Sequence, residues 1–275
     1  MKKFGIIRNT EKERTAVVST QIQAYLARHG ADSYVSATGA DLPDDLDCGI
    51  VLGGDGTLLR AAKVVLMRQL PLMGINLGNL GYLAEIDVKN MDIALDKLMM
   101  DEYTIENRMM IHGTVFHEGK REMADVALND IVLRGKKPMR AYDFQVFVND
   151  AYLTTYHADG VIVSTATGST GYNLSAGGPI VSPEARSLLL TPLAPHSLIS
   201  RSIILRGGDK IRIEVGEGRM GQLCDVAAAS FDGGGNISLE TGDVVKIRRS
   251  EKQTQIIKMN NISFLEVLRR KMADA

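Results

Sequence analysis

The sequence lacks tryptophan, and aromatic residues make up only 5% of its 275 residues. A hydrophobic core must therefore be built mainly from Leu, Ile, Val, Ala and Met. Hydrophobic residues still account for 45% of the chain and charged residues for 24%, which is typical of a globular protein with a sizeable core. At this length the chain can form two domains of ordinary size or one large domain.

The sequence also has few cysteines and almost no net charge. The two cysteines, Cys48 and Cys224, lie far apart and have no CxxC context. This excludes a disulfide framework and a cysteine zinc site, and we expect both to be small buried apolar residues. The formal net charge is −1, so the composition favours neither a nucleic acid nor an anionic membrane as partner. An anionic substrate must instead be bound by backbone amides and a few Arg or Lys side chains.

Long hydrophobic runs are missing as well. No stretch approaches the roughly 18 apolar residues of a membrane-spanning helix. The apolar run in the amino-terminal MKKFGIIRNT is too short for a signal peptide. We therefore expect a cytoplasmic protein. No GxxxxGK[ST] pattern occurs, which excludes a P-loop.

The first hundred residues alternate between strand-like and helical patterns. Short apolar runs at 4–7, 33–35, 48–52 and 72–75 are interleaved with helical patterns from about residue 11, at 57–67 and at 91–100. The run 48–52 is continuously apolar, as in a strand that is buried on both faces of a parallel sheet. Residues 1–100 are therefore predicted to form an α/β domain with an open sheet, whose sites lie at the carboxyl ends of the strands.

The pattern changes after about residue 101. Short β-rich runs follow at 114–116, 126–133, 144–148, 152–156, 161–164, 203–205, 211–215 and 244–247, separated by Gly, Asn and Asp turns. They predict an all-β, sandwich-like domain over 101–254 and an α+β protein overall. Residues 255–275 are expected to end in a helix that returns to the first domain. Ser263 and Glu266 form a capping box there, ahead of an apolar stripe made of Phe264, Leu265, Leu268 and Met272.

A glycine-rich turn, Gly53-Gly54-Asp55-Gly56-Thr57, directly follows the run 48–52 and opens the next predicted helix. Glycines there let backbone amides approach a phosphate, and the helix N-terminus adds a positive dipole. We expect Gly53, Gly54, Gly56 and Thr57 to bind phosphate. Asp55 fits a group that accepts a proton from an attacking hydroxyl or holds a metal on the phosphates. Alternatively, Asp55 merely caps the helix.

A second polar block runs from Thr165 to Gly178 and follows the apolar run 161–163. Its hydroxyls and amides can bind a polar ligand, and Tyr172 offers an aromatic face. An ordinary polar loop is the alternative, although a loop of this length inside a β domain is uncommon without a function.

Two polar pairs accompany the β-rich runs. Asn129-Asp130 lies within the run 126–133, where polar side chains are costly if they are buried without partners. An amide beside a carboxylate could hold the paired hydroxyls of a ribose, whereas a strand end that faces water is the plainer interpretation. Asp159-Gly160 precedes the run 161–164, and a simple turn is the plainer interpretation there.

These motifs occur together in one order along the chain. The series consists of GGDGT at 53–57, NLGYL at 79–83, Asn129-Asp130, Ala158-Asp159-Gly160, TATGSTGYNLSAGGPIV at 165–181, PHSL at 195–198, SFDG at 230–233 and IRRS at 247–250. This sequence resembles the NAD kinase family over nearly its whole length. GGDGT is shared with diacylglycerol and sphingosine kinases, so the specific part is the block 167–175 combined with Asn129-Asp130.

The resemblance implies a role for each matching position. Asp55 is expected to be the catalytic proton acceptor, and Asn129 and Asp130 to bind the adenosine ribose. Arg60 and Arg140 stand where a basic residue often assists. The expected NAD-binding residues are Asp55, Gly56, Arg60, Asn129, Asp130, Arg140, His157, Asp159, Thr167, Thr170, Gly171, Tyr172, Asn173, Leu174, Ser175 and Ala194.

The chain departs from the family pattern at a few positions. His157 stands where many members have Arg, which removes a permanent cation. Ala166 and Gly171 replace the commoner Pro and Ala, which should loosen the loop. Gly234 follows Phe231-Asp232-Gly233 where many bacterial members have Gln, so this chain lacks the side-chain contacts of that Gln.

The resemblance implies transfer of a phosphoryl group from ATP, or from polyphosphate, to the adenosine ribose 2′-hydroxyl of NAD. A divalent metal, Mg²⁺, is the expected cofactor, and the sequence assigns no metal ligands. Because phosphoryl transfer has a loose transition state, catalysis should depend mainly on positioning and charge stabilisation. Family members form homodimers and homotetramers, so we expect a homo-oligomer without a nucleic-acid or membrane partner.

Two other functions remain open at this point. A lipid kinase of the diacylglycerol type shares GGDGT, but it has no use for Asn129-Asp130 and needs a groove for an acyl chain. A non-catalytic NAD-binding regulator would bind NAD without forming NADP, and the presence of Asp55 argues against it.

Overall fold

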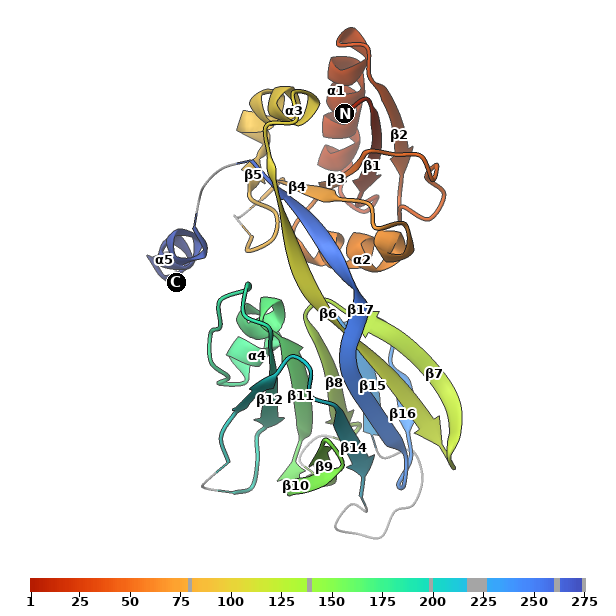
Figure 1. The fold of residues 1–275 in the computed structure, drawn as a ribbon, viewed down its shortest axis with the longest axis vertical. Coiled ribbons are helices and arrows are strands. Elements are labelled where there is room, and N and C mark those ends of the chain that lie inside the picture. The colour runs from red at the N-terminus through yellow and green to blue at the C-terminus, as the bar shows by residue number, and fades with distance from the viewer. Residues whose placement is uncertain (79–80, 138–139, 198–199, 217–226, 260–262, 274–275) are drawn as a thin grey trace. The chain divides into compact units, whose positions relative to one another are not determined.

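The computed structural model describes residues 1–78, 81–137, 140–197, 200–216, 227–259 and 263–273. The chain divides into two compact units, Met1–Arg108 with Lys252–Ala275, and Met109–Glu251 (Figure 1). Two long strands, β6 (Thr104–His117) and β17 (Val244–Lys258), each contribute residues to both units. Cys48 is fully buried, as expected, and burial raises the pKa of its thiol. Cys224 lies outside the described residues.

The first unit contains a parallel sheet. Its strands β1 (Lys3–Arg8), β2 (Asp32–Ser36), β3 (Cys48–Leu52) and β4 (Leu72–Asn76) pair in the order β2-β1-β3-β4. The short strand β5 (Ile86–Asp87) and the end of β17 pair in parallel with β4. Every residue of β3 and β4 is buried, as a strand covered on both faces requires. The α/β class predicted for this part of the chain is confirmed.

Helices cover both faces of this sheet. On one face, α1 (Glu13–Arg28) and α3 (Met91–Met99) pack in one hydrophobic cluster with Ile50 and Met73. On the other face, α2 (Asp55–Val65) packs against Gly74 of β4, where an added Cβ would come within 2.9 Å of the Leu58 side chain. A short 3₁₀ turn, η1 (Leu66–Arg68), follows α2, and a second one, η2 (Val88–Asn90), precedes α3.

The second unit consists of two antiparallel layers around one core. One sheet has the order β13 (Ile203–Arg206), β12 (Ser187–Leu193), β11 (Gly160–Thr165), β8 (Asp130–Gly135), β15 (Ala227–Phe231) and β16 (Ile237–Leu239). The other contains β10 (Ala151–Ala158), β9 (Tyr142–Val148), β14 (Ile211–Val215) and β17, with β6 and β7 (Lys120–Ala127). Val163 of the first sheet and Phe144 of the second belong to one hydrophobic cluster. The predicted all-β, sandwich-like fold of this region is confirmed.

Two local predictions are wrong, and one strand was not predicted. The run 126–133 is not one strand, because β7 ends at Ala127 and β8 begins at Asp130. The block after Thr165 is not a loop throughout, since it contains a 3₁₀ turn, η3 (Thr167–Thr170), and one turn of helix, α4 (Tyr172–Ser175). Strand β12 was not expected, because its apolar run Leu188-Leu189-Leu190 is short and a proline follows at 192 within the same strand.

The terminal helix, α5 (Phe264–Ala273), begins at the predicted cap, where the Glu266 amide donates to the Ser263 hydroxyl at 3.2 Å. Residues 255–258, however, continue β17. The predicted apolar stripe is not buried as a whole, since Leu265 and Met272 are exposed. Among the described residues, no helix has the length and apolar character needed to span a membrane.

Candidate active site

Asp55 is the first residue of α2, directly beyond the carboxyl end of β3. In a sheet with the order β2-β1-β3-β4, ligands bind where the strand order reverses, next to the ends of β1 and β3. The helix begins two residues earlier than the sequence pattern predicts. Asp55 therefore lies in its first turn rather than in the preceding loop.

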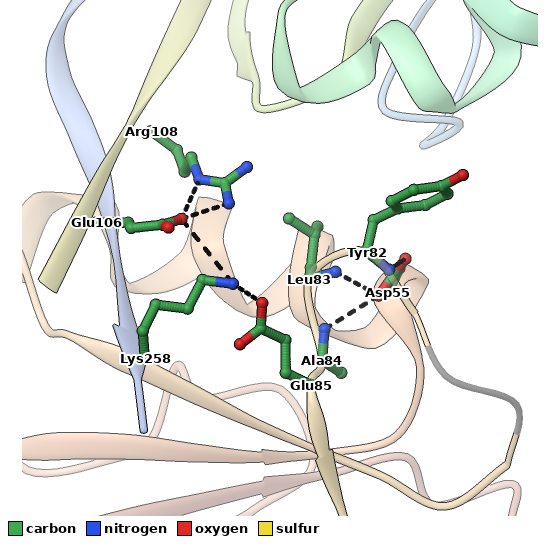
Figure 2. Close-up of polar contacts among 8 residues, drawn as sticks. All are labelled: Asp55, Tyr82, Leu83, Ala84, Glu85, Glu106, Arg108 and Lys258. Atoms are coloured by element: carbon green, nitrogen blue, oxygen red, sulfur yellow. Dashed lines mark hydrogen bonds and ion pairs between the residues drawn. The ribbon is translucent and has the colours of Figure 1, made fainter. Parts of the chain in front are cut away.

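The Asp55 carboxylate is held by three backbone amides. Its Oδ2 accepts a hydrogen bond from the Tyr82 amide at 2.8 Å, and its Oδ1 accepts from the amides of Leu83 and Ala84 at 3.1 and 3.2 Å (Figure 2). A Cβ at Gly81 would clash with the same carboxylate. Asp55 is therefore more than a helix cap, because its orientation is set by a segment 27 residues further along the chain.

The glycines of the turn differ in what surrounds them. Gly53 has a φ of +156°, and a Cβ there would clash with the Thr57 hydroxyl. At Gly54 and Gly56, by contrast, a Cβ would meet nothing within 4 Å. No side chain among the described residues caps the N-terminus of α2. Gly53 is explained by packing, whereas Gly54 and Gly56 leave an uncapped helix N-terminus accessible, which suits a phosphate.

Buried charges lie beside the segment that holds Asp55. The Lys258 ammonium pairs with the Glu85 carboxylate, and it is 3.9 Å from Oε2 of Glu106, which in turn pairs with Arg108 (Figure 2). Only 8% of the Lys258 and Glu85 side chains is exposed. Burial lowers the pKa of Lys258 to about 8, and the nearby charge of Asp55 acts in the opposite direction. The sequence motifs do not single out Lys258, because it lies outside them, at the end of a strand that carries several other charged residues.

In the second unit, Asn129 and Asp130 sit where β7 ends and β8 begins. The carboxylate of Asp232 accepts hydrogen bonds from the backbone amides of Leu128, Asn129 and Asp130 at 2.7, 2.7 and 3.1 Å. In a continuous strand these three backbone amides would be available to a neighbouring strand, but at the bend between β7 and β8 they bind the Asp232 carboxylate. The break between the two strands is therefore built by a residue more than a hundred positions away. Its only sequence signal is the Asp232-Gly233 turn, where both residues have positive φ.

Both polar side chains of this bend are in unusual environments. Asp130 is 5% exposed, and burial, followed by the charge of Asp232, raises the pKa of Asp130 to about 7. The Oδ1 atom of Asn129 is buried and has no hydrogen-bond partner among the described residues. A buried acceptor without a donor is costly, so this atom is available to accept a hydrogen bond from a hydroxyl or amide.

The turn of η3 and α4 packs directly against Asn129. The Asn129 carbonyl accepts hydrogen bonds from the Thr165 amide at 2.8 Å and the Ser164 hydroxyl at 3.1 Å. A Cβ at Gly168 would clash with that carbonyl, and a Cβ at Gly171 would lie 3.3 Å from Asn129 Nδ2 and 3.9 Å from Asp130 Oδ2. The structure thus brings together two motifs that are separated by some forty residues in the sequence.

Within that turn, the predicted binding residues face in different directions. Tyr172, Leu174 and Ser175 are exposed, whereas Asn173 is fully buried. The Asn173 amide donates to the carbonyls of Ser169 and Pro179, and its oxygen accepts from the Thr191 hydroxyl. Asn173 therefore supports the turn from inside, and its exposed neighbours offer the contact surface. Of the two threonines, Thr167 is buried, while Thr170 is half-buried and its hydroxyl is 3.4 Å from the Thr167 carbonyl.

The remaining predicted residues of this unit lie elsewhere. Asp159 and Ala194 are at the ends of β10 and β12, next to the start of β11, whereas Asn129 and Gly171 are near its end. The two groups are separated by the length of β11, roughly 16 Å at ~3.3 Å per residue. His157 is exposed with its Nδ1 2.5 Å from Asp143, and Ala194 has a φ of +43°. Arg140 is exposed, as is Arg60 on α2 of the first unit.

Comparison with known proteins decides the family. Residues 8–103 match the model of the ATP-NAD kinase N-terminal domain, and residues 128–259 match that of the ATP-NAD kinase C-terminal domain. The NAD kinase of Agathobacter rectalis is 44% identical over 285 residues, which cover 100% of this chain and 99% of the relative. The NAD kinase of Lachnospira eligens is 42% identical, with 99% and 100% covered. The chain belongs to the NAD kinase family.

Solved structures agree with this NAD kinase fold. Yeast NADH kinase complexed with NADH superposes with a TM-score of 0.91 at 23% identity, over 99% of this chain and 88% of the other. An NAD kinase from Archaeoglobus fulgidus in complex with ATP gives 0.80 at 24% identity, over 98% and 97%. The family resemblance and the enzyme class predicted from the motifs, a phosphotransferase of the NAD kinase type, are confirmed. The match of both domains removes the lipid kinase alternative.

Proposed function

We propose that this protein transfers a phosphoryl group from ATP to the adenosine ribose 2′-hydroxyl of NAD, with Asp55 as the proton acceptor. The observation that carries the proposal is the Asp55 carboxylate, which stands at an uncapped helix N-terminus and is oriented by three backbone amides. A carboxylate has about four lone-pair positions, and three hydrogen bonds leave one of them on Oδ2 for a hydroxyl proton. A hydroxyl is a poor nucleophile, so such a base assists as the new bond forms.

The phosphates and the metal belong next to this carboxylate in the proposal. The accessible amides of Gly54 and Gly56 at the start of α2 suit phosphate oxygens. Among the described residues, no group of three or more His, Cys, Asp or Glu could hold a metal. Mg²⁺ usually binds substrate phosphates together with one or two carboxylates. The triphosphate would hold the ion, because the one free position of the Asp55 carboxylate takes the hydroxyl proton, and the ion would neutralise charge on the transferred group. Polyphosphate is the alternative donor.

The adenosine ribose is assigned to Asn129 and Asp130. Asn129 Oδ1 lacks a donor that a ribose hydroxyl can provide. With a pKa of about 7, Asp130 can donate or accept a hydrogen bond near neutral pH. Gly171 leaves the space above both side chains free of a Cβ, and Tyr172 beside it offers an exposed ring. His157, Arg60 and Arg140 stay in the proposal as exposed polar groups that assist binding.

The split of the other NAD-binding candidates supports a homo-oligomer. Asp159 and Ala194 lie at the opposite end of β11 from Asn129. One way for all of them to serve NAD is for a second copy of the chain to provide the Asp159 group. We further propose a cytoplasmic protein whose functional domains are residues 1–100 with the terminal helix, and 101–254.

The test is formation of NADP from NAD, ATP and Mg²⁺, followed with a coupled NADP-dependent dehydrogenase. Asp55→Asn keeps the size of the side chain but removes its basicity. We expect kcat to fall by about a hundredfold or more, while calorimetry shows NAD binding within a few-fold of wild type. A wild-type protein that binds NAD but forms no NADP would be a non-catalytic regulator. An Asp55→Asn variant that keeps its turnover would rule out the acceptor role.

A further inference from the structure

Four charged side chains form a chain of ion pairs in the first unit, of which Lys258, Glu85 and Arg108 are buried and Glu106 is partly exposed. Lys258 at the end of β17 pairs with Glu85, which precedes β5, and lies 3.9 Å from Glu106 on β6. Glu106 also accepts hydrogen bonds from the guanidinium of Arg108, which is 5% exposed. Figure 2 shows the Lys258 ammonium between the two carboxylates.

Such a cluster is not explained by stability alone. Removing charges from water costs several kcal/mol per ion, and well-packed apolar residues in place of a buried ion pair are often neutral or stabilising. The surrounding strands β3 and β4 already provide an apolar core. A lysine and a glutamate with 8% of their side chains exposed therefore point to a requirement for a defined geometry.

The position of Glu85 in the chain indicates what that geometry serves. Glu85 directly follows Tyr82, Leu83 and Ala84, whose amides hold the Asp55 carboxylate. Its backbone leads at once into β5, which pairs with β4. The ion pair with Lys258 thus anchors the side chain at the end of the amide segment. If Glu85 shifted, the Leu83 and Ala84 amides next to it would shift as well.

We propose that Lys258 is a positioning residue for phosphoryl transfer, which acts through its ion pair with Glu85 to hold the amide segment 82–84 and thereby Asp55. The inference rests on the proposed role of Asp55 as proton acceptor. Asp55 is also near enough to Lys258 for its negative charge to raise the pKa of Lys258, against the effect of burial. Lys258 contacts no substrate in this proposal, so its loss should alter turnover rather than binding.

The experiment compares steady-state kinetics of four variants with wild type. Lys258→Met removes the charge and keeps the length, Lys258→Arg keeps the charge, and Glu85→Gln removes the partner. The matched control is Lys252→Met on the same strand, where the lysine donates to the Met67 carbonyl. Because a displacement of about 1 Å at a reacting group can cost up to about a hundredfold in rate, Lys258→Met should lower kcat at least tenfold. The KM values for NAD and ATP should stay within about twofold, and Lys258→Arg should recover most of the lost rate.

A double-mutant cycle separates positioning from a general structural role. If Lys258 acts through Asp55, Lys258→Met should reduce the residual kcat of Asp55→Asn by less than twofold. Three results would each overturn the inference. They are kcat losses of Lys258→Met and Asp55→Asn that multiply in the double variant, a kcat of Lys258→Met equal to that of Lys252→Met, and a KM that Lys258→Met raises without changing kcat. Should Lys258→Met fail to fold by circular dichroism, Glu85→Gln decides, and an unchanged kcat there overturns it too. A wild-type protein without activity, or an Asp55→Asn variant with full kcat, refutes the proposed function itself.

Discussion

At the scale of single residues, the site depends on where side chains are absent as much as on where they are present. Gly81 leaves room for the Asp55 carboxylate, Gly168 leaves room for the Asn129 carbonyl, and Gly74 leaves room for Leu58. Each of these glycines is explained by a close approach between segments that are distant in sequence. Their importance could not be read from the motifs, because the partner that each one accommodates is set by packing.

Gly81 provides a direct test of the way Asp55 is held. Gly81→Ala adds a methyl group that would clash with the Asp55 carboxylate, so the carboxylate must turn away from its amides. We expect kcat for NADP formation to fall by about tenfold or more, with a smaller change in the KM for NAD. The matched control is Gly78→Ala, since a Cβ at Gly78 would meet nothing within 4 Å. Equal kcat values for the two variants would show that the Asp55 carboxylate tolerates displacement.

Asp130 makes stability depend on pH. Its pKa is raised from 3.8 to about 7 in the folded state, so the folded protein keeps this proton in a range where the unfolded chain loses it. The contribution is fully present below about pH 4 and is lost as the pH rises towards 7. At about 1.4 kcal/mol per pKa unit, the contribution of Asp130 to the free energy of unfolding is at most roughly 4 kcal/mol.

Asp130→Asn should remove this dependence. Urea unfolding between about pH 4.5 and 7.5 is the measurement, and the free energy of unfolding should fall more steeply with pH in wild type than in the variant. Glu251→Gln is the control, because the Glu251 side chain is 88% exposed in the same unit. A pH slope that Asp130→Asn leaves intact would mean that other groups cause it.

At the scale of elements, the single helical turn α4 places residues that stabilise the turn on one face and residues that are free to contact a ligand on the other. Adjacent residues face opposite environments, since Asn173 is fully buried and hydrogen-bonded while Tyr172 is 39% exposed. The sequence marks the whole block as polar and therefore places both residues in the binding surface. Only the formation of a helical turn, in place of the extended loop, assigns them to different faces.

This separation predicts different defects in two neighbouring variants. Tyr172→Ala should raise the KM for NAD by roughly fivefold, because stacking contributes about 1 kcal/mol, and should leave the melting temperature nearly unchanged. Asn173→Ala should lower the free energy of unfolding by about 1–3 kcal/mol, since buried hydrogen-bond partners lose Asn173. Kinetics and thermal unfolding of both variants are the measurements. An unchanged KM in Tyr172→Ala would place its ring outside the NAD site.

At the scale of the whole molecule, the predicted NAD-binding residues do not gather at one point of the second unit. Asn129, Asp130 and Gly171 lie near the end of β11, while Asp159 and Ala194 lie near its start. In a closed homo-oligomer, one copy can provide the first group and its partner the second.

Subunit mixing tests this arrangement. Asp55→Asn and Asp159→Ala should each be nearly inactive alone, because each damages every site. After the two proteins are unfolded and refolded together, mixed oligomers should contain some sites with neither substitution. For random dimers, activity should recover to roughly a quarter of wild type. The two variants refolded separately and then combined without exchange are the control. A refolded mixture that stays inactive would place both residues in the same copy.

Much of the fold could be predicted from local patterns. The continuous apolar runs at 48–52 and 72–75 correctly indicate buried parallel strands, and the Ser263 cap correctly places the start of α5. The break between β7 and β8 could not be predicted, because apolar residues continue through it and the cause is the Asp232 carboxylate. Strand β12 was missed because its apolar run is only three residues long before Thr191 and Pro192, and a proline inside a run argues against a strand.

The sequence by itself determined the family and the division into an α/β part and an all-β part, and it supplied the candidate site residues, since motifs such as GGDGT and TGSTGYNLS are contiguous. The tertiary structure alone decided how those residues are held. The amides on Asp55 come from 27 to 29 positions away, the carboxylate on the Asn129 amide from 103, and the partner of Lys258 from 173. Hydrogen bonds and ion pairs over such separations form only when the sheets and helices pack, so no local pattern carries them.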